Sequence, residues 1–98
     1  TIRISKGPDI YMPTAFTPNG DGLNEYFTPI PVGIKSYNYF KIFNRWGQLI
    51  FSTTRQNEGW DGRILGKEQP TGTYVWMIEG VAFDNRKITK KGIVTLIR

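Results

Sequence analysis

The sequence contains no cysteine and no histidine among its 98 residues. Without cysteine, the chain can form neither a disulfide nor a thiolate metal site. Without histidine, it lacks the commonest general base and the commonest metal ligand. We therefore do not expect an enzyme, and we predict no catalytic residues. The lack of cysteine fits a reducing compartment and a bacterial exported protein equally well, so it does not choose between them.

Long apolar runs and helical patterns are missing as well. No segment approaches the roughly 20 apolar residues of a transmembrane helix, and nothing at the start resembles a signal peptide. Apolar residues do not recur at helical spacing, because glycine or proline interrupts most windows. The length predicts one domain. Because the chain opens with Thr1 and not with methionine, we expect it to be a piece of a longer protein.

What the sequence does have is a series of short extended segments separated by turn residues. The clearest covers residues 34–43, where alternation places Tyr37 and Tyr39 on one face and Asn38 and Phe40 on the other. Other strands are predicted at residues 1–5, 10–16, 26–30, 48–52, 73–81 and 87–98, with loops at 53–59 and 66–72. About seven such strands predict an all-β fold, a small antiparallel β-sandwich. The predicted core consists of Phe16, Phe27, Phe40, Ile42, Trp60, Tyr74, Trp76 and Leu96.

Residues 16–27 hold a polar loop between aromatic ends. Two glycines, two asparagines and two carboxylates fall within seven residues there, so we predict a positive φ at Gly20 or Gly22. The loop oxygens are spaced somewhat like those of a calcium loop, which makes calcium a candidate cofactor. A turn that satisfies its own hydrogen bonds explains the same residues, and both interpretations stay open. The candidate calcium ligands are Asn19, Asp21, Asn24 and Glu25.

The net charge is +5, and basic residues are concentrated near the end of the chain. After Asp84 no further acidic residue occurs. Such a segment suits an acidic surface, a membrane or nucleic acid, whereas lysines on a solvated hairpin also protect a sheet edge from pairing. The charges do not form a contiguous basic arm, so we expect no nucleic-acid partner. The candidate partner-binding residues are Lys87, Lys90, Lys91 and Arg98.

Three tryptophans raise a second question, because aromatic platforms stack on sugar rings or bases. Trp76 belongs to an alternating strand and Trp60 adjoins a tight turn, so both are expected in the core. Trp46, at the tip of a predicted hairpin, stays open between core and surface. Asp61 follows Trp60 and is expected to accept backbone N–H bonds within its own turn.

Five segments together closely resemble the gliding motility-associated C-terminal domain, also called the type B sorting domain of the type IX secretion system. They are Ala-Phe-Thr-Pro-Asn-Gly-Asp-Gly-Leu-Asn at 15–24, Phe-Lys-Ile-Phe-Asn-Arg-Trp-Gly at 40–47, Trp-Asp-Gly at 60–62, Pro-Thr-Gly-Thr-Tyr at 70–74 and Gly-Ile-Val-Thr-Leu-Ile-Arg at 92–98. The resemblance covers residues 10–98 and leaves residues 1–9 as a linker or the end of a preceding segment. One departure is Glu25, where the family usually shows Asp. The longer side chain moves the carboxylate by about one methylene, which weakens any argument from metal geometry.

The resemblance implies an Ig-like sandwich that follows a large cargo protein, often an adhesin. It also implies a non-catalytic sorting signal that the outer-membrane secretion machinery recognises, with a barrel-type outer-membrane partner protein. The cargo would pass through the periplasm and the outer membrane to the cell surface. The alternative is a carbohydrate-binding β-sandwich module of a secreted protein.

Overall fold

The computed structural model describes residues 8–18, 20, 22 and 25–98. This part of the chain contains strands and no helix, so it also contains no helix that could span a membrane. The strands are β1 (Asp9–Tyr11), β2 (Ala15–Phe16), β3 (Ile30–Val32), β4 (Ile34–Phe43), β5 (Leu49–Thr53), β6 (Arg63–Ile64), β7 (Lys67–Glu68), β8 (Gly72–Ala82) and β9 (Lys87–Leu96). The all-β prediction is confirmed, with nine strands instead of about seven. The strand predicted at residues 1–5 lies outside the described residues.

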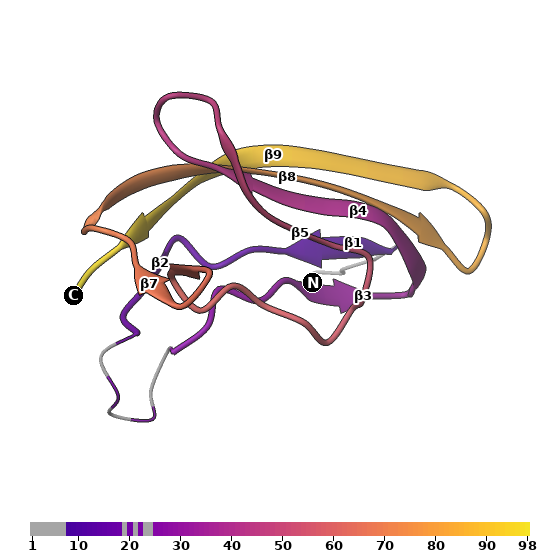
Figure 1. Cartoon of the computed structure of the whole chain (residues 1–98). Coiled ribbons are helices and arrows are strands. Elements are labelled where there is room, and N and C mark those ends of the chain that lie inside the picture. The colour runs from indigo at the N-terminus through magenta and orange to yellow at the C-terminus, as the bar shows by residue number, and fades with distance from the viewer. Residues whose placement is uncertain (1–7, 19, 21, 23–24) are drawn as a thin grey trace, which may run out of the picture.

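Two layers of sheet make up the sandwich (Figure 1). In Figure 1 the upper layer shows β9, β8 and β4, which with β2 and β5 at the edges form a five-stranded sheet in the order β2-β9-β8-β4-β5. Below it lie the pair β1-β3 and the small hairpin β6-β7. All neighbouring pairs are antiparallel except β2 and β9, which run parallel through Ala15↔Thr95 and Phe16↔Leu96. One parallel pair, β2 with β9, therefore closes a sandwich that is otherwise antiparallel. The turn residues in the sequence did not predict this pair.

Two features favour the Ig-like assignment. The long strands follow the order β9-β8-β4-β5, as the central strands of one sheet do in immunoglobulin-like sandwiches. In addition, the Tyr74 hydroxyl donates to the backbone oxygen of Pro70 at 2.7 Å, four residues upstream and at the start of β8. Such a tyrosine corner is typical of these sandwiches, where it fixes the connection that enters the strand.

Aromatic rings fill the space between the layers. The Phe16 ring centroid lies 5.9 Å from that of Phe27 and 5.6 Å from that of Trp60, which is in turn 5.0 Å from Tyr74. Fully burying one such side chain contributes about 1.5–3 kcal/mol. Phe27 and Trp60 also exchange two backbone hydrogen bonds, at 2.8 and 3.1 Å. Every predicted core residue is buried: Phe16, Phe27, Phe40, Ile42, Trp60, Tyr74, Trp76 and Leu96.

The clearest predicted strand, at residues 34–43, has its predicted ends but not its predicted faces. The register of β4 against β8 shifts between Ile34 and Ser36 and again between Tyr37 and Tyr39. Each shift inserts one residue and reverses the face to which the following side chains point. Tyr37 is therefore buried, whereas Tyr39 lies on the outer face opposite Glu79. The expectation that Tyr37 and Tyr39 share a face is wrong, because simple alternation does not reveal bulges.

The short strands differ most from the predictions. The strand expected at residues 26–30 is reduced to the isolated pairing of Phe27 with Trp60, and β3 begins only at Ile30. The predicted loop at residues 66–72 contains β7, which forms a hairpin with β6. Leu65 (φ 52°) and Gly66 (φ 81°) make its two-residue turn, whose left-handed backbone suits the twist of paired strands.

Candidate functional site

The glycine-rich loop is only partly described, and its described part holds itself together. Gly20 and Gly22 both have positive φ, 84° and 81°, as predicted. Their backbone N–H groups donate to the two carboxylate oxygens of Glu25, at 3.0 and 2.8 Å. This is the arrangement expected for a turn that satisfies its own hydrogen bonds. The other candidate calcium ligands, Asn19, Asp21 and Asn24, lie outside the described residues.

No cluster of three or more acidic side chains suited to a metal ion occurs within the described residues. Glu25 and Asp61 do line one hollow together with Arg63 and Glu68. Because the guanidinium of Arg63 shares that hollow with the carboxylates, it balances part of their negative charge. The calcium hypothesis stays a prediction.

The Trp-Asp-Gly segment forms a tight turn against the end of β9. Asp61 Oδ1 accepts the backbone N–H of Arg63 at 3.0 Å, which confirms the role predicted for this carboxylate. The Trp60 indole Nε1 donates to the Arg63 oxygen, also at 3.0 Å. Gly62 has φ 81°, and a Cβ there would lie 3.1 Å from Arg98 Nη2, Leu96 Cδ1 and Pro18 Cγ. Both the backbone conformation and the lack of space require glycine at this position.

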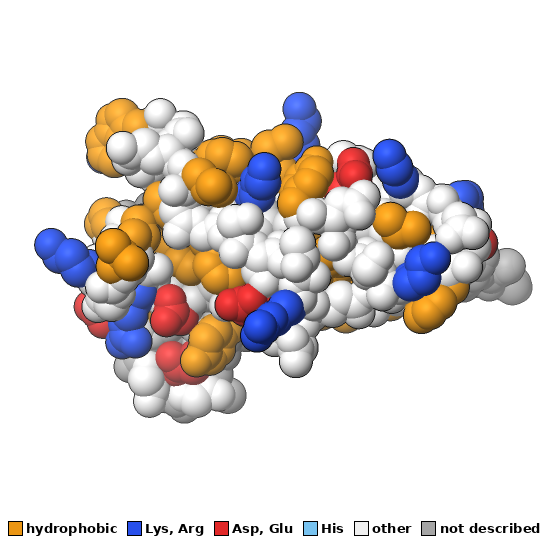
Figure 2. All heavy atoms as spheres, turned by 45° about the vertical axis from the view of Figure 1, so that its right-hand side comes forward, with side chains coloured by type: hydrophobic (Ala, Val, Ile, Leu, Met, Phe, Trp, Pro, Cys, Tyr) orange, Lys and Arg blue, Asp and Glu red, His pale blue; other side chains and the backbone are white. Residues whose placement is uncertain are grey.

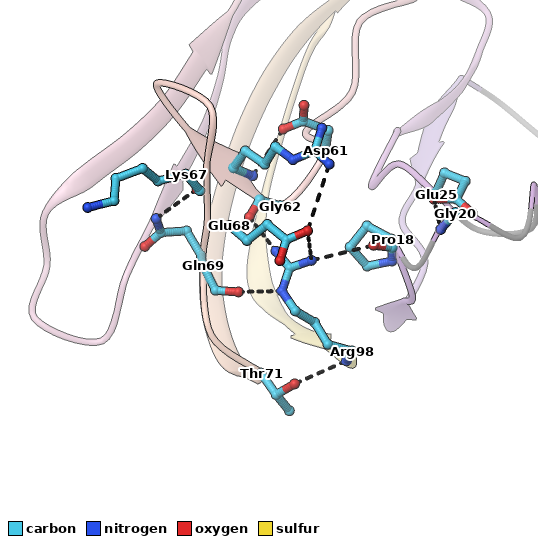
Figure 3. Close-up of polar contacts among 11 residues, drawn as sticks. Pro18, Gly20, Glu25, Asp61, Gly62, Lys67, Glu68, Gln69, Thr71 and Arg98 are labelled. Carbon is cyan, nitrogen blue, oxygen red and sulfur yellow. Dashed lines mark hydrogen bonds and ion pairs between the residues drawn. The ribbon is translucent and has the colours of Figure 1, made fainter.

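Arg98 joins segments that are far apart in the sequence, in what we call the Arg98 junction (Figure 3). Its guanidinium donates to the backbone oxygens of Gly62 at 2.7 Å, Gln69 at 2.6 Å and Pro18 at 3.4 Å. Its backbone N–H donates to Thr71 Oγ1 at 3.0 Å. The planar, permanently charged fork of arginine suits this role, because it can donate in several directions at once.

Glu68 adds a weak electrostatic contribution to the Arg98 junction. Its Oε2 lies 3.7 Å from Arg98 Nη1 and 3.8 Å from Arg63 Nη2, and its side chain is 58% exposed. Ion pairs this open to water contribute little to stability. The carbonyl contacts therefore dominate the junction, and Arg98 acts there as a structural clamp. The sequence had suggested only a charge available to a partner.

The five resembling segments surround the same end of the sandwich. Residues 15–24, 60–62, 70–74 and 92–98 each supply a residue to the Arg98 junction. Residues 40–47 lie close by, since Asn44, Arg45 and Trp46 line a hollow of about 120 Å³ whose other wall is residues 69–74. The sequence alone did not predict that these segments lie close together in space. Only the fold shows that they form one region.

The candidate basic residues do not form one patch. Alternation along β9 points Lys87 and Lys91 outward, whereas Lys90 is on the inner face with the buried Val94. Lys90 Nζ contacts Asp9 Oδ1 at 2.7 Å and lies 6.0 Å from the Tyr11 ring centroid. Arg98 lies just beyond the opposite end of β9, roughly 35 Å from Lys87 at the usual rise per residue. Partner binding by these four residues stays a prediction.

The three tryptophans do not form a platform. Trp60 and Trp76 belong to the core, with exposed fractions of 1% and 7%. Trp46 is 72% exposed at the tip of the β4–β5 hairpin. It is therefore a surface residue, a point that the sequence had left open. The Arg45 guanidinium lies 4.6 Å from its ring centroid, a cation–π contact that occupies part of the ring.

Comparisons with known proteins point in one direction. Residues 10–96 match a family model described as the CHU_C type IX secretion signal domain. No curated protein and no solved structure matches the chain. The family match covers nearly the whole chain and includes four of the five resembling segments in full. The chain belongs to the type IX secretion signal domain family, whose members are sorting signals for export across the outer membrane.

Proposed function

We propose that this domain is a non-catalytic sorting signal that is read in its folded form. It directs a cargo fused to its N-terminal side through the periplasm and outer membrane to the cell surface. It does so by binding outer-membrane components of the type IX machinery, among them a barrel-type partner protein. The observation that supports a folded signal is the Arg98 junction, because it gathers the resembling segments at one end of the sandwich.

A linear tag would need none of this geometry. The guanidinium of Arg98 reaches the oxygen of Pro18 across 80 positions in the sequence. Unfolding separates these groups, so a receptor that reads this end of the molecule distinguishes folded from unfolded chains. A receptor that reads a short terminal segment does not.

The test compares export with folding. Residues 1–98 are fused to a periplasmic passenger in a bacterium with type IX secretion, and the passenger at the cell surface is measured by protease accessibility. Gly62→Ala places a Cβ against Arg98, Leu96 and Pro18 on a left-handed backbone, and such strain costs about 1–3 kcal/mol. We expect a lower melting temperature and less export. Gly72→Ala is the matched control, because a Cβ there meets nothing within 4 Å and no strained φ is involved.

Two further variants separate a folded signal from a linear one. Deleting residues 95–98 removes the β2–β9 pairing and the Arg98 junction, so folding and export should both be lost. Replacing Lys87, Lys90 and Lys91 by Gln should leave the fold intact and at most slow export. Full export of the truncated, unfolded chain, or of residues 87–98 attached alone to the passenger, would refute a folded signal.

A sugar-binding module is the second candidate, and exposed Trp46 beside a hollow is the observation that favours it. Of the three tryptophans only Trp46 is exposed, and Arg45 partly covers its ring. This function predicts retention on sugar columns that Trp46→Ala abolishes. If the passenger is exported and the domain is not retained on any sugar column, the sugar-binding function is excluded and only the sorting function stands.

A further inference from the structure

The outer face of the five-stranded sheet carries an apolar row that crosses four strands, which we call the outer stripe. It consists of Leu49, Phe43, Val75 and Ile93: Phe43 pairs with Leu49 of β5 and with Val75 of β8, and Val75 pairs with Ile93 of β9. Leu49 is 52% exposed and Ile93 is 62% exposed. The described second layer covers only the other face of the sheet (Figure 1). Single exposed apolar residues are normal, but a contiguous row marks an interaction site.

Cations flank the outer stripe on both sides. In the neighbouring row, Lys41 pairs with Met77, which pairs with Lys91. On the other side, the β4–β5 hairpin with Arg45 and Trp46 rises above the sheet at the upper left of Figure 1. Figure 2 shows hydrophobic and basic side chains interspersed along this upper side of the molecule, with an acidic side chain also among them. Neither the stripe nor the Lys41–Met77–Lys91 row contains an acidic residue.

The nearest carboxylate on this face is already engaged. Glu79 stands one row beyond Met77, paired with Tyr39 and Thr89. Its oxygens accept from Asn38 Nδ2 at 2.7 Å and Thr89 Oγ1 at 3.3 Å. The Asn38 hydrogen bond lowers the pKa of Glu79, so this carboxylate keeps its negative charge. It stands one row farther from the outer stripe than Lys41 and Lys91, so the charges that directly flank the stripe are positive.

We infer that the outer stripe binds a partner protein whose apolar side chains stand within an acidic surface. This inference rests on the proposed function and names the face that the secretion machinery contacts. Apolar contact supplies affinity once water is excluded, and opposite charge around it steers the encounter. A second copy of this chain fits poorly, because pairing two such faces brings Lys41 and Lys91 against like charges and the net charge of each copy is +5. Trp46 and Arg45 add the two residue types most enriched at interface hot spots.

The test uses two pairs of variants in the full chain fused to the passenger. Val75→Thr with Ile93→Thr removes apolar surface from the stripe and keeps β-branched residues in the strands. Ile30→Thr with Val32→Thr is the matched control, since these side chains are 56% and 48% exposed on β3 in the other layer. We expect about a tenfold or greater loss of surface passenger for the stripe pair, as for loss of interface hot spots, and about the wild-type level for the control pair.

Charge reversal provides the second arm. Lys41→Glu with Lys91→Glu should lower export by a similar factor, because an acidic partner then meets like charge. Lys35→Glu with Arg55→Glu makes the same change in net charge at exposed residues outside the stripe and the Arg98 junction, and it should export normally. Melting temperatures are measured for all four variants. If the threonine pair proves less stable than wild type, the charge-reversed pair decides, since it removes no apolar side chain. Its melting temperature shows the effect of losing the contact between Lys41 Nζ and the Tyr39 ring, whose centroid is 5.2 Å away.

Photo-crosslinking identifies the partner. A photoreactive amino acid replaces Ile93, or Ile30 as control, and the cells are irradiated during export. We expect Ile93, but not Ile30, to crosslink to an outer-membrane protein at a peptide rich in Asp and Glu. A crosslink to a second copy, to lipid or to a peptide without acidic residues would overturn the inference.

The two failures are distinguishable. If the wild-type fusion is not exported at all, the proposed sorting function fails and this inference fails with it. If the wild type is exported and both stripe variants are exported equally well, the sorting function stands and only the outer stripe is excluded as its contact face.

Discussion

Tyr37 buries a hydroxyl that has no hydrogen-bond partner among the described residues. Burial raises the pKa of Tyr37 from its ordinary 10.0 to about 12. Because the folded pKa is the higher one, the associated stability is present in full below pH 10 and is lost as the pH rises toward 12. Tyr37→Phe removes both the titration and the unpaired hydroxyl. We expect equal or greater stability at pH 7, by up to about 1 kcal/mol, and a smaller loss between pH 10 and 12.

Denaturant unfolding at several pH values measures this effect. Tyr39→Phe is the matched control, because it removes a hydroxyl from the outer face of the same strand. A loss of about 2 kcal/mol or more for Tyr37→Phe at pH 7 would show that the hydroxyl has a bonding partner after all.

Gly92 makes room for a tryptophan. The ring of Trp76 crosses β9 there, and a Cβ on Gly92 would lie 2.9 Å from Trp76 Cζ2. The indole Nε1 then donates to the oxygen of Ile93 at 3.2 Å. We expect Gly92→Ala to lower the free energy of unfolding by about 1–3 kcal/mol through overpacking. In a Trp76→Phe background, Gly92→Ala should lower the free energy of unfolding by less. Equal losses in both backgrounds would show that contact with the Trp76 ring is not the cause.

Glu25 offers a separate test of the glycine-rich loop. Its carboxylate accepts two backbone N–H groups, so Glu25→Gln should lower the melting temperature with or without calcium. The calcium hypothesis adds that calcium raises the melting temperature of the wild type, since an ion that binds only the folded state stabilises it. Chelator-treated protein that shows no shift on adding calcium, together with an unaltered Asp21→Ala variant, would remove that hypothesis.

At the scale of the elements, one ion pair ties the two layers together. Lys90 of β9 reaches Asp9 of β1, and this hydrogen bond is the main reason why the pKa of Asp9 lies below its ordinary 3.8. Because the folded pKa is the lower one, the pair stabilises the protein above about pH 4 and is lost as the pH falls through the folded pKa. Both side chains are about one-third exposed, so solvent screening limits the effect to about 0.5 kcal/mol.

Asp9→Asn should flatten the loss of stability below pH 4, as measured by urea unfolding between about pH 2 and 6. The same substitution in a Lys90→Met background should add little, because the partner is already gone. If the double variant still loses as much stability in acid as the wild type does, that loss of stability comes from a group other than the Asp9–Lys90 pair.

The sequence predicted the long strands better than the short ones, and the cause is physical. In β4 and β8, runs of ten and eleven extended residues, together with the Asn44–Gly47 turn after β4, leave little choice of boundary. Strands of two or three residues, such as β2 and β6, are too short to show any period. They exist because distant partners hold them. The two bulges of β4 could not be predicted from the sequence for a similar reason. An inserted residue is recognised only from the pairing of β4 with β8.

Across the whole molecule, the predictions succeeded for the apolar core and for polar groups that act locally, and they failed for residues whose role depends on particular distant partners. The positive φ of Gly20 and the Asp61 turn follow from neighbouring residues, and both are confirmed. Arg98 could be recognised only as a charge, because its partners come from three other segments. Tyr37 and Gly92 likewise owe their roles to neighbours across the sheet.

The parallel pairing of β2 with β9 also sets an order of events. It joins residue 15 to residue 95, so a chain made from its N-terminus cannot close the sandwich until residue 96 is available. Contacts this distant in sequence make folding slow, on the order of milliseconds to seconds. A chain that stopped before residue 95 would lack this pairing. Under the function proposed above, such a chain would also lack the folded signal, so export would depend on the completion of β9.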